Sequence, residues 1–201
     1  MTDPRLDELE LHRLIAAYAD GVTRRDWDGL RDLFEADAVL HLDLVDRGTR
    51  DLIGPAEILG FIGTSVERFD FFEFVALNVL VTVPVGVADS GIVDPGGTRV
   101  SEPEALFEAD TARIRTFMCE IRHHRDDGPH AEDVGGGGWS TAFGVYQDTA
   151  VRSDGVWRFA ERLQPSAMLF LDNLGWAREF KQQFPACKVI SRSYGAEAGL
   201  F

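Results

Sequence analysis

Two polar side chains alternate with leucines in the segment AVLHLDLV, residues 38–45, and could act together as an acid–base pair. In an extended strand, side chains two positions apart point to the same face, so His41 and Asp43 share one face. A carboxylate beside an imidazole can orient it, and histidine titrates near neutral pH. The pair therefore predicts a general base, with His41 accepting the proton. The alternative is a histidine whose hydrogen bonds are satisfied in the core or at the surface.

Two other residues inside predicted strands carry reactive or polar groups. Asn78 interrupts the apolar run VALNVLV. Because a buried amide needs hydrogen-bond partners, Asn78 either ties down a loop or presents a hydrogen bond to a ligand. Cys119 lies in the middle of a strand without an evident activating base, so we expect a buried structural thiol.

Clusters of potential ligands elsewhere do not form a recognisable site. The segment HHRDDGPH, residues 123–130, holds ligand-type side chains, but their spacing fits no closed zinc pattern. The glycines at 135–138 are not followed by the Lys-Ser/Thr pair of a phosphate loop. We therefore predict solvated loops, no metal site and no cofactor.

The helices that must position these residues begin at the N-terminus. After Asp3 and Pro4, which suit the start of a helix, one stripe of apolar residues recurs at helical spacing: Leu11, Leu14, Ile15, Tyr18 and Val22. Asp20 lies opposite this stripe and is expected to face water. Asp26 can cap a short second helix that continues to Phe34, and Gly54-Pro55 opens a third helix.

Strands dominate the rest of the chain. Strand-like patterns cover residues 38–45, 71–83, 111–124, 139–152 and 156–163, and Ser153-Asp154-Gly155 predicts a hairpin turn. Residues 84–109 form a long loop, with one helical turn expected at EPEALFEA. Helices followed by mostly antiparallel strands indicate an α+β fold, with a curved sheet wrapped around the helices.

Composition narrows the class of protein. The chain has 201 residues, 45% of them hydrophobic, which is enough for one domain with a sizeable core. A net charge of −14 argues against nucleic acids and anionic membranes as partners. The sequence has no apolar run long enough for a membrane span, and its two cysteines make no disulfide framework. We expect a cytoplasmic protein.

Five segments in order resemble the SnoaL-like branch of the nuclear-transport-factor-2-like (NTF2-like) superfamily, which includes proteins similar to scytalone dehydratase. They are LIAAYADGVTRRDWDGLRDLFEADAVLHL, GPAEILGFI, FVALNVLV, DTARIRTFM and GVYQDTAVRSDGVWRFAERL. The resemblance spans roughly residues 8–165. It implies a cone-shaped α+β barrel with one deep apolar pocket, and cofactor-independent eliminations, isomerisations or ring closures.

The resemblance also implies positions for an Asp–His pair, and the chain departs from both. The family aspartate lies five residues after the first-helix tyrosine, Tyr18, where this chain has Thr23. The family histidine lies four residues before the strand asparagine, Asn78, where this chain has Phe74. The surrounding motif is matched by Tyr18, Asn78, Tyr146 and Arg162.

Strand parity indicates which residues surround the expected pocket. Phe74 and Asn78 share one parity, Met118 and Glu120 share a face of the next strand, and Trp157, Phe159 and Glu161 share a face of the last. We predict that the following residues contact substrate: Thr23, Phe74, Asn78, Met118, Glu120, Trp157 and Glu161. Such a wall suits a flat, hydrophobic substrate.

The function expected is an enzyme that dehydrates, isomerises or cyclises an aromatic or polyketide-like intermediate. His41 with Asp43 removes a proton next to a carbonyl group, and Tyr18 or Tyr146 hydrogen-bonds the oxygen on which charge develops. Glu120 and Glu161 are further acid–base candidates. A binding protein without catalysis and a beta-type subunit of an oxygenase complex are the alternatives.

The resemblance further implies a homodimer. We expect residues 1–165 to form the SnoaL-like domain. Residues 166–201 are expected to form an extension packed on that domain or on a partner subunit.

Overall fold

A computed structural model describes residues 4–44, 48–83, 110–125, 139–164 and 169–170. Three helices lie in these ranges: α1 (Pro4–Arg24), α2 (Trp27–Arg31) and α3 (Gly54–Glu67). The strands are β1 (Phe34–Leu44), β2 (Gly48–Ile53), β3 (Phe69–Thr82), β4 (Thr111–His124), β5 (Trp139–Ser153), β6 (Val156–Gln164) and β7 (Leu169–Phe170). The predicted loops at 84–109 and 126–138, including EPEALFEA and the glycine run, lie outside the described residues.

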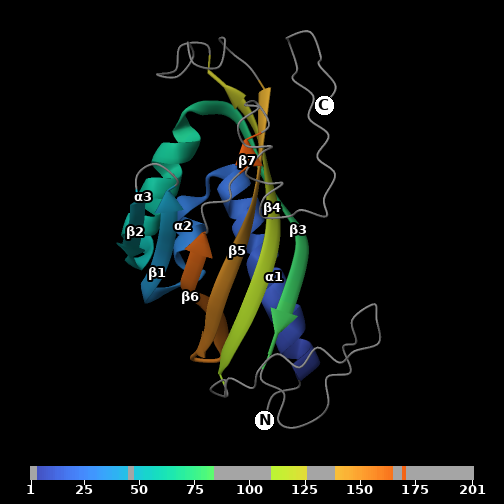
Figure 1. Ribbon diagram of the computed structural model, residues 1–201. Coiled ribbons are helices and arrows are strands. Elements are labelled where there is room, and N and C mark those ends of the chain that lie inside the picture. The colour runs from blue at the N-terminus through green and yellow to red at the C-terminus, as the bar shows by residue number, and fades with distance from the viewer. Residues whose placement is uncertain (1–3, 45–47, 84–109, 126–138, 165–168, 171–201) are drawn as a thin grey trace.

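The described strands form one curved sheet (Figure 1). Its strands lie in the order β2-β1-β6-β5-β4-β3, and β7 adds to β5 beside this path. β1 and β6 pair in parallel, whereas the other pairs are antiparallel. The predicted α+β class is confirmed, and the sheet stays open rather than closing into a barrel.

The helices pack against one face of this sheet, here called the inner face; the opposite side is the outer face. α1 contacts β3 and β6, and α3 contacts β1, β2 and β3. Every residue of the predicted α1 stripe is buried: Leu11, Leu14, Ile15, Tyr18 and Val22. Asp20 faces solvent as predicted, where it forms an ion pair with Arg24 at 2.8 Å. The core therefore lies between α1, α3 and the inner face.

Two element boundaries differ from the sequence prediction. α2 is capped by Asp26, whose carboxylate accepts a hydrogen bond from the Gly29 N–H at 3.1 Å. The helix ends at Arg31, and Phe34 already begins β1, because the N–H of Phe159 on β6 donates to the Leu33 carbonyl at 2.8 Å. The edge strand β2 was not predicted at all. β7 falls within the expected extension, and the rest of 166–201 lies outside the described residues.

A β-bulge in β3 changes which of its side chains face inward. Ala76 pairs with Met118, but Val79 pairs with the residue two positions earlier on β4, Thr116. One extra residue on β3 is therefore left between the two pairs. Before the bulge Ala76 packs against the core, and after it Val79 does so, while Asn78 is exposed. The expected shared face of Phe74 and Asn78 is thus wrong.

A second bulge lies in β6. Phe159 pairs with Ala150, whereas Glu161 pairs with Thr149, so the strand gains one residue between them. Phe159 is buried on the inner face, Glu161 is exposed on the outer face, and Arg162 returns to the interior with 2% exposure. The expected shared face of Phe159 and Glu161 is therefore wrong.

Candidate active site

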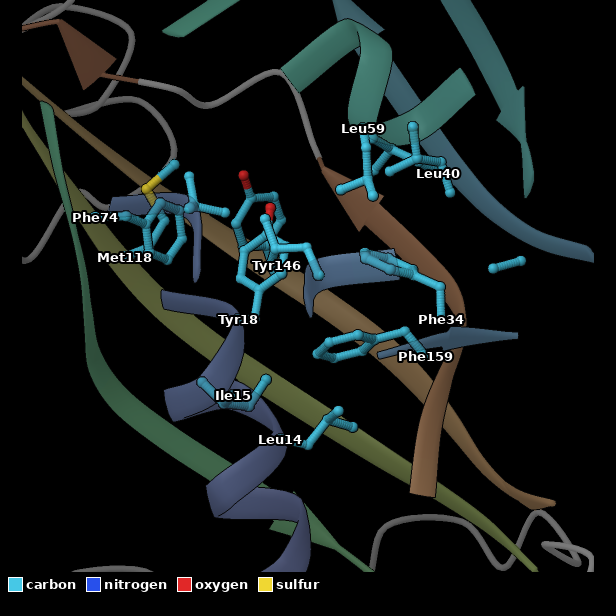
Figure 2. Packing of buried hydrophobic residues seen from close by; sticks show 14 of the residues in the cluster. Leu14, Ile15, Tyr18, Phe34, Leu40, Leu59, Phe74, Met118, Tyr146 and Phe159 are labelled. Atoms are coloured by element: carbon cyan, nitrogen blue, oxygen red, sulfur yellow. The ribbon is translucent and has the colours of Figure 1, made fainter. Parts of the chain in front are cut away.

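Five rings from separate elements meet in the core, and we call them the aromatic cluster: Tyr18, Phe34, Phe74, Tyr146 and Phe159 (Figure 2). The Tyr18 ring meets those of Phe74 and Tyr146 edge-on, with centroids 5.5 and 6.5 Å away. Phe74 stacks on Tyr146 at 6.0 Å. Figure 2 shows the hydroxyl oxygens of Tyr18 and Tyr146 directed to the same side of the cluster. Tyr18, Phe74 and Tyr146 therefore lie together in the core.

A buried ion pair lies against these rings. Arg162 donates through Nε and Nη2 to the two carboxylate oxygens of Asp148, at 2.6 and 3.0 Å. Its guanidinium carbon lies 4.1 Å from the Tyr18 ring centroid and 4.5 Å from that of Tyr146. A guanidinium so placed attracts the ring faces and brings a fixed positive charge to the two tyrosines.

The pKa values of the two tyrosines and of the ion pair are all shifted by this arrangement. Burial raises the pKa of Tyr18 and raises that of Tyr146 well above its ordinary range, while the charge of Arg162 opposes both shifts. Burial opposes a charge on Arg162 too, yet the Asp148 carboxylate raises the pKa of the guanidinium. Burial raises the pKa of Asp148, and Arg162 opposes this. Because arginine does not lose its proton in proteins, the two-point contact keeps the pair ionised.

Glu120 brings a carboxyl group to the same inner face. Its strand, β4, turns Ile114, Met118 and Arg122 inward, and Glu120 lies opposite Phe74 of the aromatic cluster in the β3–β4 register. The Glu120 side chain is 14% exposed, and Arg122 lies 3.7 Å away. Among the described residues, no side chain or backbone group hydrogen-bonds this carboxylate. Burial raises the pKa of Glu120, and Arg122 opposes the shift.

Thr23 and Phe74, at the positions of the implied Asp–His pair, are neighbours in space. The Thr23 hydroxyl oxygen accepts a hydrogen bond from the Phe74 N–H at 2.9 Å, and the hydroxyl lies 3.4 Å from the Phe74 carbonyl oxygen. The hydroxyl thus ties α1 to β3. Neither side chain can exchange a proton at neutral pH, so these two residues cannot serve as an acid–base pair.

A model of the SnoaL-like domain matches residues 4–163, which is most of the chain. The chain belongs to the SnoaL-like family. No curated protein matches its sequence significantly. The predicted SnoaL-like, NTF2-like family is therefore confirmed.

Solved structures share the SnoaL-like fold. A proposed aromatic ring hydroxylase from Novosphingobium aromaticivorans is 22% identical, with a TM-score of 0.59 over 88% of this chain and 99% of that one. A proposed scytalone dehydratase from the same species is 17% identical, with a TM-score of 0.56 over 82% and 87%. The hexachlorocyclohexane dehydrochlorinase LinA-type3 from Novosphingobium barchaimii is 17% identical, with a TM-score of 0.57 over 82% and 88%.

His41 lies on the outer face of this SnoaL-like sheet, because its neighbours Leu40 and Leu42 fill the core. Its ring nitrogens lie 2.7 Å from Asp51 on β2 and 3.0 Å from Glu161 on β6. Both carboxylates come from neighbouring strands, and the pairing of His41 with Asp43 stays a prediction. The side chain of Asp43 lies outside the described part of the chain. The sheet therefore separates His41 and Glu161 from the aromatic cluster.

We predict that this outer-face site makes stability depend on pH. A neutral imidazole has one N–H, so both hydrogen bonds need protonated His41. The Asp51 hydrogen bond raises the pKa of His41, and Glu161 adds to the effect against burial. A raised folded pKa gives stability that is complete below the unfolded pKa of about 6.5 and lost as pH rises through the folded pKa. Relative to His41→Gln, the wild type should lose up to about 1 kcal/mol over this range in urea unfolding. Parallel pH curves for the two proteins would contradict this.

The remaining predicted contact residues lie at different places. Met118 is buried on β4, between Ala76 and Gly144 in the register. Trp157 is buried at the hairpin end of β6, where the Arg152 guanidinium lies 4.5 Å from its ring. Asn78 is exposed after the β3 bulge. Within the described residues, Met118 thus lies beside Glu120, and Asn78 does not face the core.

The described part of the chain offers neither a metal site nor a membrane-spanning helix. No group of three or more His, Cys, Asp or Glu side chains there could hold a metal ion. No helix there is long and apolar enough to cross a membrane. His124 is the last residue of β4, as the predicted strand 111–124 has it, and its Nε2 lies 2.9 Å from the Ser140 hydroxyl. The residues of 123–130 beyond Arg125 lie outside the described ranges.

Arg162 and Asp148 are candidate functional residues that the sequence did not lead us to place in the site. Arg162 was noted only as part of the family motif, and Asp148 was not among the predicted site residues. Regular alternation of Trp157 and Phe159 inward would place Arg162 on the outer face, so its burial could not be predicted. No local pattern in the sequence indicates the bulge that turns Arg162 inward.

Proposed function

We propose that this protein is an enzyme that moves a proton on a hydrophobic small molecule, with Glu120 as the general base. The observation that carries the proposal is a mostly buried carboxyl group, without a hydrogen bond from any described residue, on the same face as two buried tyrosines. Burial raises the pKa of Glu120 toward the range where a base works well near neutral pH.

The two tyrosines suit the other half of this chemistry. Removing a proton next to a carbonyl group moves the C–H electron pair onto the carbonyl oxygen as an enolate. The hydroxyls of Tyr18 and Tyr146 can donate hydrogen bonds to that oxygen, and the adjacent charge of Arg162 strengthens them as donors. The enolate electron pair can then return to form a carbon–carbon double bond, while the hydroxyl group on the next carbon leaves as water with the proton that Glu120 took up.

The substrate class we propose is a flat, aromatic or polyketide-like intermediate that undergoes dehydration, isomerisation or ring closure. The rings of the aromatic cluster favour contact with a flat hydrophobic molecule. Two structural neighbours are named as a scytalone dehydratase and a dehydrochlorinase, both of which denote eliminations. These names support elimination as the reaction to test first.

A second candidate function is binding of the same kind of molecule without chemistry. Thr23 and Phe74 favour it, since they occupy the positions implied for an acid–base pair and cannot transfer protons. In this case the aromatic cluster would serve only as a hydrophobic contact surface.

Deuterium uptake separates the two candidates. The purified protein is incubated in D₂O with a panel of hydrophobic cyclic ketones that carry a β-hydroxyl group, without any added cofactor. Mass spectrometry follows deuterium at the carbon next to the carbonyl group and loss of water. An enzyme accelerates either change for at least one ketone. Ketones that quench tyrosine and tryptophan fluorescence on binding, yet exchange no faster than in buffer, would favour the binding function.

A further inference from the structure

Arg122 lies next to Glu120 on the inner face, and both side chains are shielded from solvent. Arg122 Nη1 is 3.7 Å from the Glu120 carboxylate, and the exposed fractions of the two side chains are 7% and 14%. Residues two apart on a strand share a face, so the pair follows from the regular geometry of β4. At this distance and depth, the positive charge acts on the carboxylate with little screening.

Phe69 holds the guanidinium in position. The guanidinium carbon of Arg122 lies 5.3 Å from the Phe69 ring centroid. The Phe69 ring stacks on Phe72 at 5.8 Å, and Phe72 is the register partner of Arg122 on β3. A planar guanidinium over an aromatic face is kept in one orientation, which an ammonium group is not.

We propose that Arg122 is a positioning residue that keeps Glu120 ionised and oriented as the base of the reaction. The proposal rests on the proposed function, in which Glu120 must be deprotonated before it can accept a proton. A carboxyl group buried among aromatic rings favours its neutral form, and an opposite charge within about 4–6 Å restores the charged form. Arg122 supplies this charge without forming the short two-point contact that Arg162 makes with Asp148.

Other titratable groups around Glu120 act more weakly or in the opposite direction. Arg68, at the end of α3, also favours the Glu120 carboxylate, but it is exposed and its Nε donates to the Ser65 carbonyl at 2.8 Å. Tyr18 from α1 and Tyr146 from β5 stay neutral, because the charge of Glu120 adds to the burial that raises their pKa values. Phe74, opposite Glu120 on β3, carries no charge.

The test is a direct titration of the Glu120 carboxyl group by carbon-13 NMR on the ligand-free protein. In Arg122→Met, the midpoint should move to higher pH by about one to three pH units relative to wild type. Arg122→Lys, which keeps the charge, should recover part of that shift. Arg68→Met, the matched control, should move it much less. Arg122→Met with an unmoved midpoint, or Arg122→Lys with the same midpoint as Arg122→Met, overturns the proposal.

This titration separates the role of Arg122 from the proposed function. It needs no substrate, so an unmoved midpoint counts against Arg122 alone. Once a substrate is found, the acidic limb of the kcat/KM profile of Arg122→Met should move with the Glu120 midpoint. A moved midpoint with an unmoved acidic limb would instead overturn Glu120 as the base.

Discussion

Turnover by Glu120→Gln should fall by about 10²- to 10⁴-fold, the usual cost of removing a general base. Glutamine keeps the size and polarity of the side chain but cannot accept a proton. Since the Glu120 carboxylate takes no hydrogen bond from a described residue, the substitution should preserve the fold, although stability falls because Arg122 loses a negative charge 3.7 Å away. The measurement is kcat and KM on the ketone identified by deuterium uptake, with circular dichroism to verify the fold.

Two further variants test whether the loss of activity is specific to Glu120. Glu73→Gln, an exposed carboxylate on the neighbouring strand β3, is the matched control and should turn over like the wild type. His41→Gln tests the base that the sequence suggested, and its outer-face position predicts a small effect. If His41→Gln loses activity while Glu120→Gln keeps it, the base has been assigned to the wrong side of the sheet.

The second large effect concerns stability. Asp148→Ala should lower the free energy of unfolding by about 3–5 kcal/mol, because it leaves the charge of Arg162 buried without its partner. Both side chains are almost completely buried, with 3% and 0% exposed for Arg162 and Asp148. Urea unfolding followed by tryptophan fluorescence measures the loss.

A surface ion pair provides the comparison for this prediction. Asp20→Ala removes the partner of Arg24 at 2.8 Å, but both side chains are more than half exposed. Its cost should be no more than about 0.5 kcal/mol. Similar small losses for Asp148→Ala and Asp20→Ala would mean that water reaches Arg162, and that the aromatic cluster does not enclose its charge.

Much of the fold could be predicted because its elements follow regular periods. The α1 stripe placed Tyr18 inside and Asp20 outside, and alternation along β4 placed Met118 and Glu120 inward, all as the structure has them. Such patterns need no tertiary information, since one buried face is enough to fix them.

The errors in the candidate site have one physical origin. Parity arguments assume that a strand keeps its period, but β3 gains a residue between Ala76 and Val79, and β6 gains one between Phe159 and Glu161. Asn78 and Glu161 were therefore assigned to the wrong face. The described partners of His41, which are Asp51 and Glu161, come from the strands on either side of β1. Cross-strand partners depend on register, which this sequence alone did not specify.

The extra residue in β6 has a consequence for how this chain can change in length. Ala160 is the residue added between Phe159 and Glu161, and its side chain is only half-buried. Deleting it would exchange the faces of the two residues that follow, bringing Glu161 inside and moving Arg162 out to solvent. A substitution at Ala160 changes one side chain. A deletion there would replace the positive charge of Arg162 beside Tyr18 by the negative charge of Glu161. We therefore expect insertions and deletions in this strand to be tolerated far less than replacements.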